Sequence, residues 1–362
     1  MKQRNQMIDL ARMLFCLAVV SNHWNSMVNG SESVYITTRY GYLSVEFFFL
    51  VSGYLMAASL KKYQHQSIGI STGRMLISKY KRILPYYSIA WGLGMIVQHL
   101  SETTTITQIA KHTIMSVPAF LGLQMLGVPL YQANGPTWYI SAMLITMLIS
   151  YPLLYTFKKK YCEVIAPIIA VLCYCYLLAT VGHFSTIDPL ENGIVYTGLI
   201  RGFAGISLGC TCYSFTQVLS AKNFTIWGKK LLTAVELCSY MMALLLMNSQ
   251  GWIRPDFYVI LCFAIAITLT FSNKTFTAQL NLPFSTGFLG SLSLIIYLVD
   301  SPARALTVHI LPNVGRDLRI LPSLFISACF CVVTIFLGKL LIKIMSYVAF
   351  KLRKACFEKV TN

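Results

Sequence analysis

Several windows of about 18 to 25 residues carry almost no charged side chain, and this feature limits the possible folds most strongly. A helix of that length crosses a hydrocarbon layer roughly 30 Å thick, where only helices or closed barrels satisfy their backbone hydrogen bonds. The windows 163–182 and 320–338 are continuously apolar, whereas barrel strands alternate apolar and polar residues. Only 11% of the 362 residues are charged, against about a quarter in soluble domains. The sequence therefore predicts an all-α, polytopic membrane protein with one membrane-embedded domain over residues 1–362.

The apolar windows predict ten transmembrane helices, and an even number of spans places both termini on one side of the membrane. We expect the spans at residues 8–28, 40–60, 83–101, 137–157, 163–182, 195–219, 231–248, 255–273, 285–303 and 320–345. The segment 112–135 is apolar but interrupted by Pro118, Pro129 and glycines. It is therefore predicted to be a re-entrant or surface segment rather than an eleventh span.

The net charge of +17 lies mainly in the links between the predicted spans, which argues against nucleic acid as a partner. If the termini are cytoplasmic, 21 of the 29 lysines and arginines fall in inner segments and six in outer segments. This bias predicts cytoplasmic termini. The eleven cysteines lie in or beside apolar segments, and pairs such as Cys173 and Cys175 point to nearly opposite helix faces. We therefore expect neither a disulfide framework nor a metal site.

The first predicted span carries three ionisable residues on one stripe of its surface, namely Asp9, Arg12 and His23. An Arg or Asp at the centre of a span costs roughly 2.5 to 3.5 kcal/mol, so each needs a reason. Arg12 and His23 are separated by a net rotation of roughly 20° and by about 16 Å along the axis. We predict that His23 is catalytic and takes a proton from a hydroxyl, and we include Arg12 and Asp9 among the catalytic residues. Alternatively, Arg12 extends to the inner interface and His23 hydrogen-bonds a neighbouring helix.

The second predicted span contains another buried charge, Glu46, seven residues before Gly53 on the same face. A small residue such as Gly53 lets another backbone approach closely, but packing does not explain Glu46. Glu46 indicates either a function or an ion pair with a nearby arginine, and we include it among the catalytic candidates. Tyr42 and Ser52 are candidate contacts to a bound donor and candidate oxyanion donors.

A basic group, Lys79, Lys81 and Arg82, precedes the third predicted span. These residues either anchor the span at the inner membrane surface or bind the phosphates of a nucleotide carrier. We assign them to the donor site as the functional interpretation.

Three further residues are candidate substrate contacts: Trp138, Arg201 within the sixth span, and Asp300 near the outer end of the ninth. A Trp at the start of a span is also typical of an interfacial anchor. Asp300 and Arg304 are four residues apart, so they are able to pair with each other.

With these residues the sequence resembles the acyltransferase-3 family, integral-membrane O-acyltransferases of bacterial surface polysaccharides, along nearly its whole length. The most specific element is the Arg-x10-His pattern of Arg12 and His23, with Asp9 just upstream. The segment from Gly41 to Leu55 is similar to the family pattern G-x-x-x-V-D/E-x-F-F-x-x-S-G-F/Y, and Lys79-x-x-Arg82 to its Arg-x-x-Arg motif. Weaker likenesses lie at Trp138, from Arg201 to Gly209, and from Ser291 to Leu298, the last similar to S-x-x-x-Y-L.

The resemblance implies a ten-helix fold, acyl-CoA (usually acetyl-CoA) as the donor, and a hydroxyl of a surface or lipid-linked glycan as the acceptor. It also implies a multi-pass location in the bacterial cytoplasmic membrane, His23 as the catalytic residue, Arg12 as its partner, and Lys79 and Arg82 near the donor. Two residues depart from the family pattern. Asp300 stands where many members have His, so no family role is carried over to it, and Lys79 replaces the first Arg of its motif. We expect no additional periplasmic domain of the kind that some members carry, and we therefore expect transfer to be completed in the membrane portion or by a partner.

The hypothesis is a direct transfer in which acyl-CoA binds from the cytoplasm and His23 activates a glycan hydroxyl from the outer side. A covalent acyl-enzyme intermediate is equally compatible with the sequence. The alternative from another class is a polytopic transporter or flippase of a lipid-linked glycan, which would also hold ionisable residues within spans, although no inverted repeat is evident. A glycan polymerase or ligase is a third alternative, but it would usually have a longer outer loop.

Overall fold

The computed structural model describes residues 5–25, 38–101, 104–128, 131–190, 195–249, 254–282 and 286–361. Within this part of the chain the regular structure is helical, and the β pairing consists of one isolated bridge between Pro189 and Tyr196. The predicted all-α class is therefore confirmed. Pro129, Lys2, Arg4 and the predicted span ends at residues 26–28 and 285 lie outside the described residues.

The described residues form eleven α-helices joined by short 3₁₀ and π turns. The helices are α1 Gln6–Asn25, α2 Ser44–Tyr63, α3 Ile68–Ser101, α4 Ile106–Phe120, α5 Trp138–Phe157, α6 Ala166–Thr180, α7 Thr197–Ala221, α8 Ile226–Met247, α9 Asp256–Ser272, α10 Thr286–Ile310 and α11 Ile320–Thr361. The turns are Gly41–Leu43, Gln124–Leu126, Gly135–Thr137, Tyr161–Ile165, Phe276–Gln279 and Arg316–Arg319.

Six helical segments of the described chain are long and apolar enough to cross a membrane. They are Gly41–Tyr63, Gly135–Phe157, Tyr161–Thr180, Ile226–Met247, Thr286–Ile310 and Ile320–Lys351. The helix α9 is apolar but has only 17 residues. The other predicted spans coincide with α1, α3 and α7, which carry Arg12, the Lys79 group and Arg201. The protein is thus a multi-pass membrane protein, and the total of ten spans stays a prediction.

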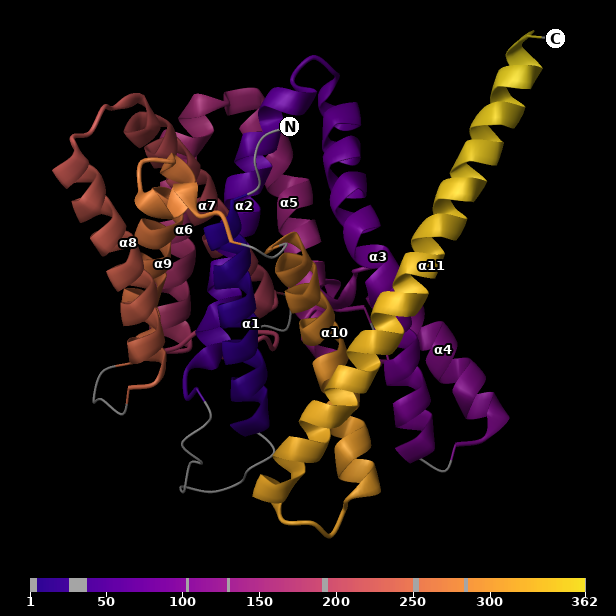
Figure 1. Ribbon diagram of the computed structural model, residues 1–362. Coiled ribbons are helices and arrows are strands. Elements are labelled where there is room, and N and C mark those ends of the chain that lie inside the picture. The colour runs from indigo at the N-terminus through magenta and orange to yellow at the C-terminus, as the bar shows by residue number, and fades with distance from the viewer. Residues whose placement is uncertain are drawn as a thin grey trace.

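The long helices run up and down one bundle, and α1 begins at the same end at which α11 finishes (Figure 1). We call this the terminal end. The links from α2 to α3, α5 to α6, α7 to α8 and α9 to α10 lie at the terminal end too (Figure 1). These links and the adjoining helix ends hold lysine groups 61–62, 158–160 and 229–230. The basic segments that predict the cytoplasmic side therefore gather at one end of the bundle.

The helix α4 lies apart from this up-and-down pattern, beside the opposite end of α3 (Figure 1). A capping box between Thr105 and Gln108 starts it, and the chain turns back after it through Gly122 with a φ of +77°. The hydroxyls of Tyr80 and Tyr87 on α3 donate to the carbonyl groups of Phe120 and Ala119, which fixes the end of α4 against α3. The helix α4 has only 15 residues, and the re-entrant or surface position of this segment stays a prediction.

Two glycines let α2 and α7 pack with their backbones in close approach. A Cβ atom on Gly53 would lie 2.1 Å from the carbonyl oxygen of Ile206, and one on Gly209 would lie 2.1 Å from that of Leu50. The expected role of Gly53 in close helix packing is therefore observed. This contact holds the buried charges of the two helices in register.

The helix α1 is fixed on both sides. Phe15 packs against Phe47 and Phe263, with both ring centroids 4.8 Å away. On its other side, the Cys16 thiol donates to the carbonyl oxygen of Ser293, 3.0 Å away, and so brings α1 against α10. The polar stripe of α1 thereby faces α10.

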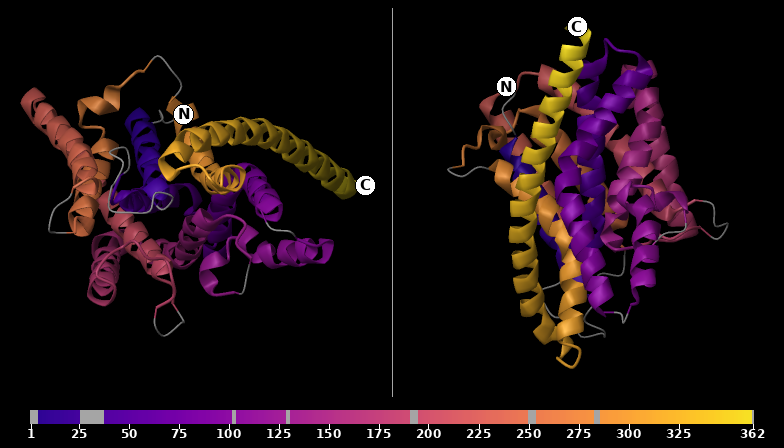
Figure 2. Two further views of the ribbon diagram at one scale, coloured as in Figure 1. Left: turned by 90° about the horizontal axis from the view of Figure 1, so that it is seen from below. Right: turned by 90° about the vertical axis from the view of Figure 1, so that its right-hand side faces the viewer.

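The helix α11 continues well past its predicted end at residue 345. Its 42 residues extend about 63 Å at 1.5 Å per residue, about twice the thickness of a hydrocarbon core. Its C-terminal part projects beyond the neighbouring helices at the terminal end (Figures 1 and 2).

Candidate active site

A cavity of about 670 Å³ opens between α1, α2, α3, α5 and α10, with Ile342 of α11 at its edge. Its polar lining comes from Arg12, Ser52, Lys79, Lys81, Arg82, Tyr86, Tyr139, Ser291, Ser293 and Tyr297. Apolar side chains such as Val45, Phe48 and Met143 form the remaining wall. Five of the predicted site residues therefore share one cavity, although they come from three different helices.

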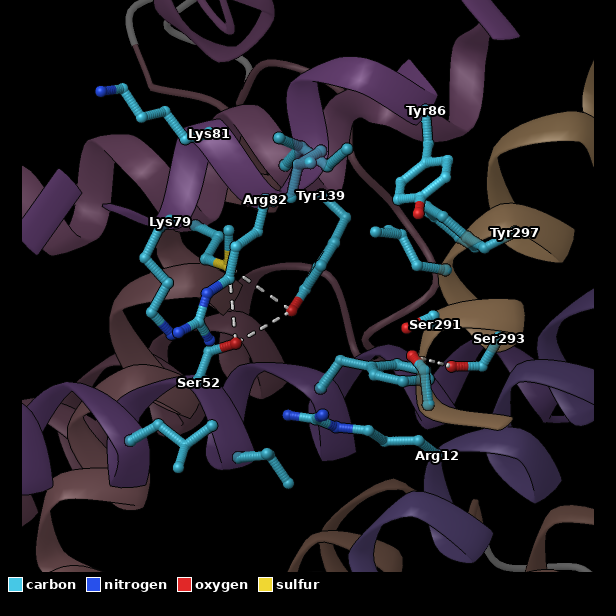
Figure 3. Close-up of a pocket in the computed structure, with 18 of the residues that line it drawn as sticks. Arg12, Ser52, Lys79, Lys81, Arg82, Tyr86, Tyr139, Ser291, Ser293 and Tyr297 are labelled. Carbon is cyan, nitrogen blue, oxygen red and sulfur yellow. Dashed lines mark hydrogen bonds between the residues drawn. The ribbon is translucent and has the colours of Figure 1, made fainter. Parts of the chain in front are cut away.

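Three of the cations point into this cavity. Arg12, Lys79 and Arg82 direct their charged groups toward Ser52 and Tyr139, whereas Lys81 points away from them (Figure 3). Lys79 is half-buried and precedes the predicted span 83–101. Burial, followed by the charges of Arg12 and Arg82, lowers its pKa to about 8. A cluster of positive charges in a partly buried cavity lining favours the binding of an anionic ligand.

A pair of hydroxyls lies beside these cations. The Ser52 Oγ and Tyr139 Oη atoms are 3.2 Å apart, and the Tyr139 ring packs 4.7 Å from Phe49 and 6.2 Å from Tyr297. Tyr297 donates its hydroxyl hydrogen to the carbonyl oxygen of Pro136. Tyr139 and Tyr297 were not among the predicted site residues. The Tyr297 signal lay in the segment from Ser291 to Leu298, but nothing in the sequence distinguished Tyr139 from its neighbour Trp138.

His23 lies on the same stripe of α1 as Arg12 and contacts α10 rather than Arg12. Its Nδ1 atom is 2.8 Å from Oδ2 of Asp300, which also accepts a hydrogen bond from Nε of Arg304 at 3.1 Å. The side chain of His23 is 26% exposed and that of Asp300 only 1%, so the imidazole is the accessible member of the pair. The predicted pairing of Asp300 with Arg304 is present, but His23 as a third member was not predicted.

The partner of Arg12 differs from the one that the family resemblance implied. Its guanidinium lies 3.8 Å from the carboxylate of Asp9, one turn earlier on α1, and not beside His23. The reason is the axial separation of about 16 Å between Arg12 and His23. Arg12 belongs to the cavity wall and His23 to the α10 contact.

Glu46 forms a buried ion pair, the second of the two interpretations drawn from the sequence. Its Oε1 atom accepts from Nε of Arg201 and its Oε2 atom from the Tyr174 hydroxyl, both at 2.8 Å. Arg201 also donates to the carbonyl of Thr186 and lies 5.0 Å from the Trp138 ring centroid. Glu46 and Arg201 are at most 1% exposed, and neither lines the cavity. This placement favours a structural role for both over the predicted catalytic and substrate contacts.

Two other predicted contacts lie elsewhere. The hydroxyl of Tyr42 donates to Oδ1 of Asp256 at 3.1 Å and does not line the cavity, because Tyr42 sits in the turn that precedes α2. Trp138 is 7% exposed and faces α7, where Gly198 leaves room for its ring. Trp138 is therefore neither an interfacial anchor nor a wall of the cavity.

The fold and the site define a multi-pass helical membrane protein with a cation-lined cavity and a histidine–aspartate pair on facing helices. A family model described as an acyltransferase domain matches residues 5–342. The chain therefore belongs to the acyltransferase-3 family and is a membrane acyltransferase, as the sequence resemblance implied. No curated protein matches the chain in a sequence comparison, and no solved structure matches it either.

Proposed function

We propose that this acyltransferase moves an acyl group, in the first place acetyl, from acyl-CoA to a hydroxyl of a surface or lipid-linked glycan. The observation that carries the proposal is the convergence of Arg12, Lys79 and Arg82 on one cavity beside Ser52 and Tyr139. Acyl-CoA carries phosphates at one end and a thioester at the end of its narrow pantetheine chain. The phosphates suit the cations of the cavity, and the pantetheine chain suits its partly apolar wall. The volume of about 670 Å³ lies in the usual range for small-molecule sites.

The proposed orientation places the terminal end in the cytoplasm of a bacterial cell, with ten spans in the cytoplasmic membrane. The positive-inside bias supports it, because the lysine groups of the links lie at the terminal end. Lys79 and Arg82 come from the part of α3 that follows the link at this end. Cytoplasmic acyl-CoA would then meet the cations first, and a glycan would approach from the opposite side.

The proposed chemistry is a direct transfer with His23 as general base. His23 takes the proton of the acceptor hydroxyl, the hydroxyl oxygen forms a bond to the thioester carbonyl carbon, and the carbon–sulfur bond breaks. The proton then passes from His23 to the leaving CoA thiolate, so that free CoA and an ester are the products. The hydroxyls of Ser52 and Tyr139 and the guanidinium of Arg12 are the candidate contacts to the bound acyl-CoA, because all three groups line the cavity.

The test uses the purified full-length chain in vesicles with radiolabelled acetyl-CoA and glycan-bearing membrane lipid from the host. We expect labelled glycan and stoichiometric free CoA from the wild type, and a rate about 10² to 10⁴ lower from His23→Ala. His309→Ala is the matched control, because His309 is exposed on α10 and lies nine residues beyond Asp300, the contact of His23. Normal transfer by folded His23→Ala would remove His23 from this role. A wild type that binds glycan lipid without releasing CoA would favour the transporter alternative.

A further inference from the structure

We propose that Asp300 is the positioning residue of His23, whose imidazole it orients and whose protonated form it stabilises during transfer. The inference rests on the proposed function, because it assigns a role within that reaction. It replaces the predicted substrate contact of Asp300 by a contact to the general base.

The hydrogen bond between the two residues assigns the tautomer of the imidazole. A carboxylate only accepts hydrogen bonds, so at 2.8 Å from Oδ2 of Asp300 the Nδ1 atom of His23 carries the hydrogen. The lone pair that takes up a proton is then on Nε2, at the far edge of the ring. A free imidazole would divide between both tautomers, and only one of them suits the reaction.

The surroundings of Asp300 keep its carboxylate available for this task. It is 1% exposed, and Arg304 donates to the same oxygen from one turn further along α10, which compensates the buried charge. When His23 becomes positive, the carboxylate lies in direct contact with the new charge in a water-poor setting, where such a contact is strongest. This second hydrogen bond to Oδ2 limits the rotation of the carboxylate.

The other oxygen of the Asp300 carboxylate is buried as well. Among the described residues its Oδ1 atom is buried and has no hydrogen-bond partner. The Oδ2 atom of Asp256 is also buried without a partner among the described residues, so Asp256 shares this feature with Asp300 and is matched to it in this respect.

The pair lies next to the cavity, although neither His23 nor Asp300 lines it. Tyr297 lines the cavity and lies one turn before Asp300 on α10. Within the described residues, the titratable groups close enough to act electrostatically on Asp300 include Cys16 on α1 and Tyr297 and Arg304 on α10. Arg304 is the charged group among these three. Its positive charge therefore reduces the electrostatic stabilisation that the Asp300 carboxylate gives to protonated His23.

The experiment measures kcat, KM for acetyl-CoA and the pH–rate profile of the full-length protein in vesicles. We expect Asp300→Asn to lower kcat by at least about 10²-fold with KM for acetyl-CoA unchanged. The acidic limb of its profile should move to lower pH by roughly one unit, because the protonated imidazole loses its stabilising charge. Asp300→Glu keeps the charge and should leave the limb near its wild-type position. Arg304→Gln should move the limb the opposite way, because the carboxylate then acts on His23 alone.

Asp256→Asn is the matched control. Asp256 is also 1% exposed, but it accepts from the Tyr42 hydroxyl and the Phe184 backbone N–H, away from His23. This variant should lose stability without moving the pH limb. An active wild type and an inactive His23→Ala, together with an unshifted limb in Asp300→Asn and Arg304→Gln, would overturn the assignment. If Asp300→Asn does not fold, the shift in Arg304→Gln decides the question. Absence of transfer by the wild type would instead refute the proposed function.

Discussion

Replacing Arg201 by methionine should destabilise the protein far more than a typical substitution. The change keeps an unbranched, flexible side chain of somewhat smaller volume but removes the charged donor 2.8 Å from Oε1 of Glu46. The carboxylate is fully buried, and Tyr174 alone would still donate to it. A buried charge that loses its partner costs about 3 to 5 kcal/mol. Loss of the stacking on Trp138 adds about 1 kcal/mol.

The double variant Arg201→Met with Glu46→Gln separates the stranded charge from the lost packing. Glutamine removes the negative charge and still offers an oxygen to the Tyr174 hydroxyl. Replacing both members of a buried ion pair is often close to neutral, so the double variant should lie within about 2 kcal/mol of the wild type. The coupling between the two sites should then be about 2 kcal/mol or more, well above the additive expectation.

The assay is equilibrium unfolding in mixed detergent micelles, followed by tryptophan fluorescence, with acyl transfer measured in parallel on the folded fraction. If Arg201→Met and the double variant are equally unstable, the stranded-charge argument is wrong. If Arg201→Met keeps wild-type stability but its KM for the acceptor rises, Arg201 binds substrate and the structural assignment fails.

Three further predictions concern the cavity and the packing. Lys79→Gln should raise KM for acetyl-CoA by about ten- to 150-fold, because a hydrogen bond to a charged group is worth about 1.5 to 3 kcal/mol. Lys81→Gln should leave this KM unchanged, because the side chain of Lys81 points away. In an initial-rate pH series, KM for acetyl-CoA should rise between pH 7 and 9, because Lys79 with its pKa of about 8 loses its charge over that range. Lys79→Arg should show no such rise, because arginine stays charged. Gly53→Ala should reduce the yield of folded protein, because its Cβ would lie 2.1 Å from the Ile206 carbonyl oxygen. Gly73→Ala should leave the yield unchanged, because no atom lies within 4 Å of a Cβ at that position. Equal yields from the two variants would contradict the close α2–α7 packing.

The sequence was informative wherever the relevant physics lies within one helix. Helical periodicity placed Asp9 and Arg12 on one face of α1, and they lie 3.8 Å apart. The cost of a buried charge indicated that Glu46 needs a partner, and Arg201 is that partner. The need for close approach at Gly53 followed from its small size.

The sequence was uninformative where contacts join distant helices. His23 and Asp300 are 277 residues apart, and periodicity does not tell which helix faces α1. Extrapolation along a helix also failed at Tyr42, because the residues Gly41–Leu43 form a 3₁₀ turn before α2 begins. Tyr139 and Trp138 are neighbours, and a rotation of about 100° between them decides which one lines the cavity.

The central claim is that acyl-CoA binds at the terminal end and that its acyl group leaves on a glycan hydroxyl. The most direct measurement uses sealed vesicles whose orientation is scored by protease access to a C-terminal tag. Radiolabelled acetyl-CoA, which does not cross the bilayer, is supplied on one side only. The account predicts labelled glycan and free CoA only when acetyl-CoA is on the side that bears the tag. Labelling that requires acetyl-CoA on the opposite side would contradict it.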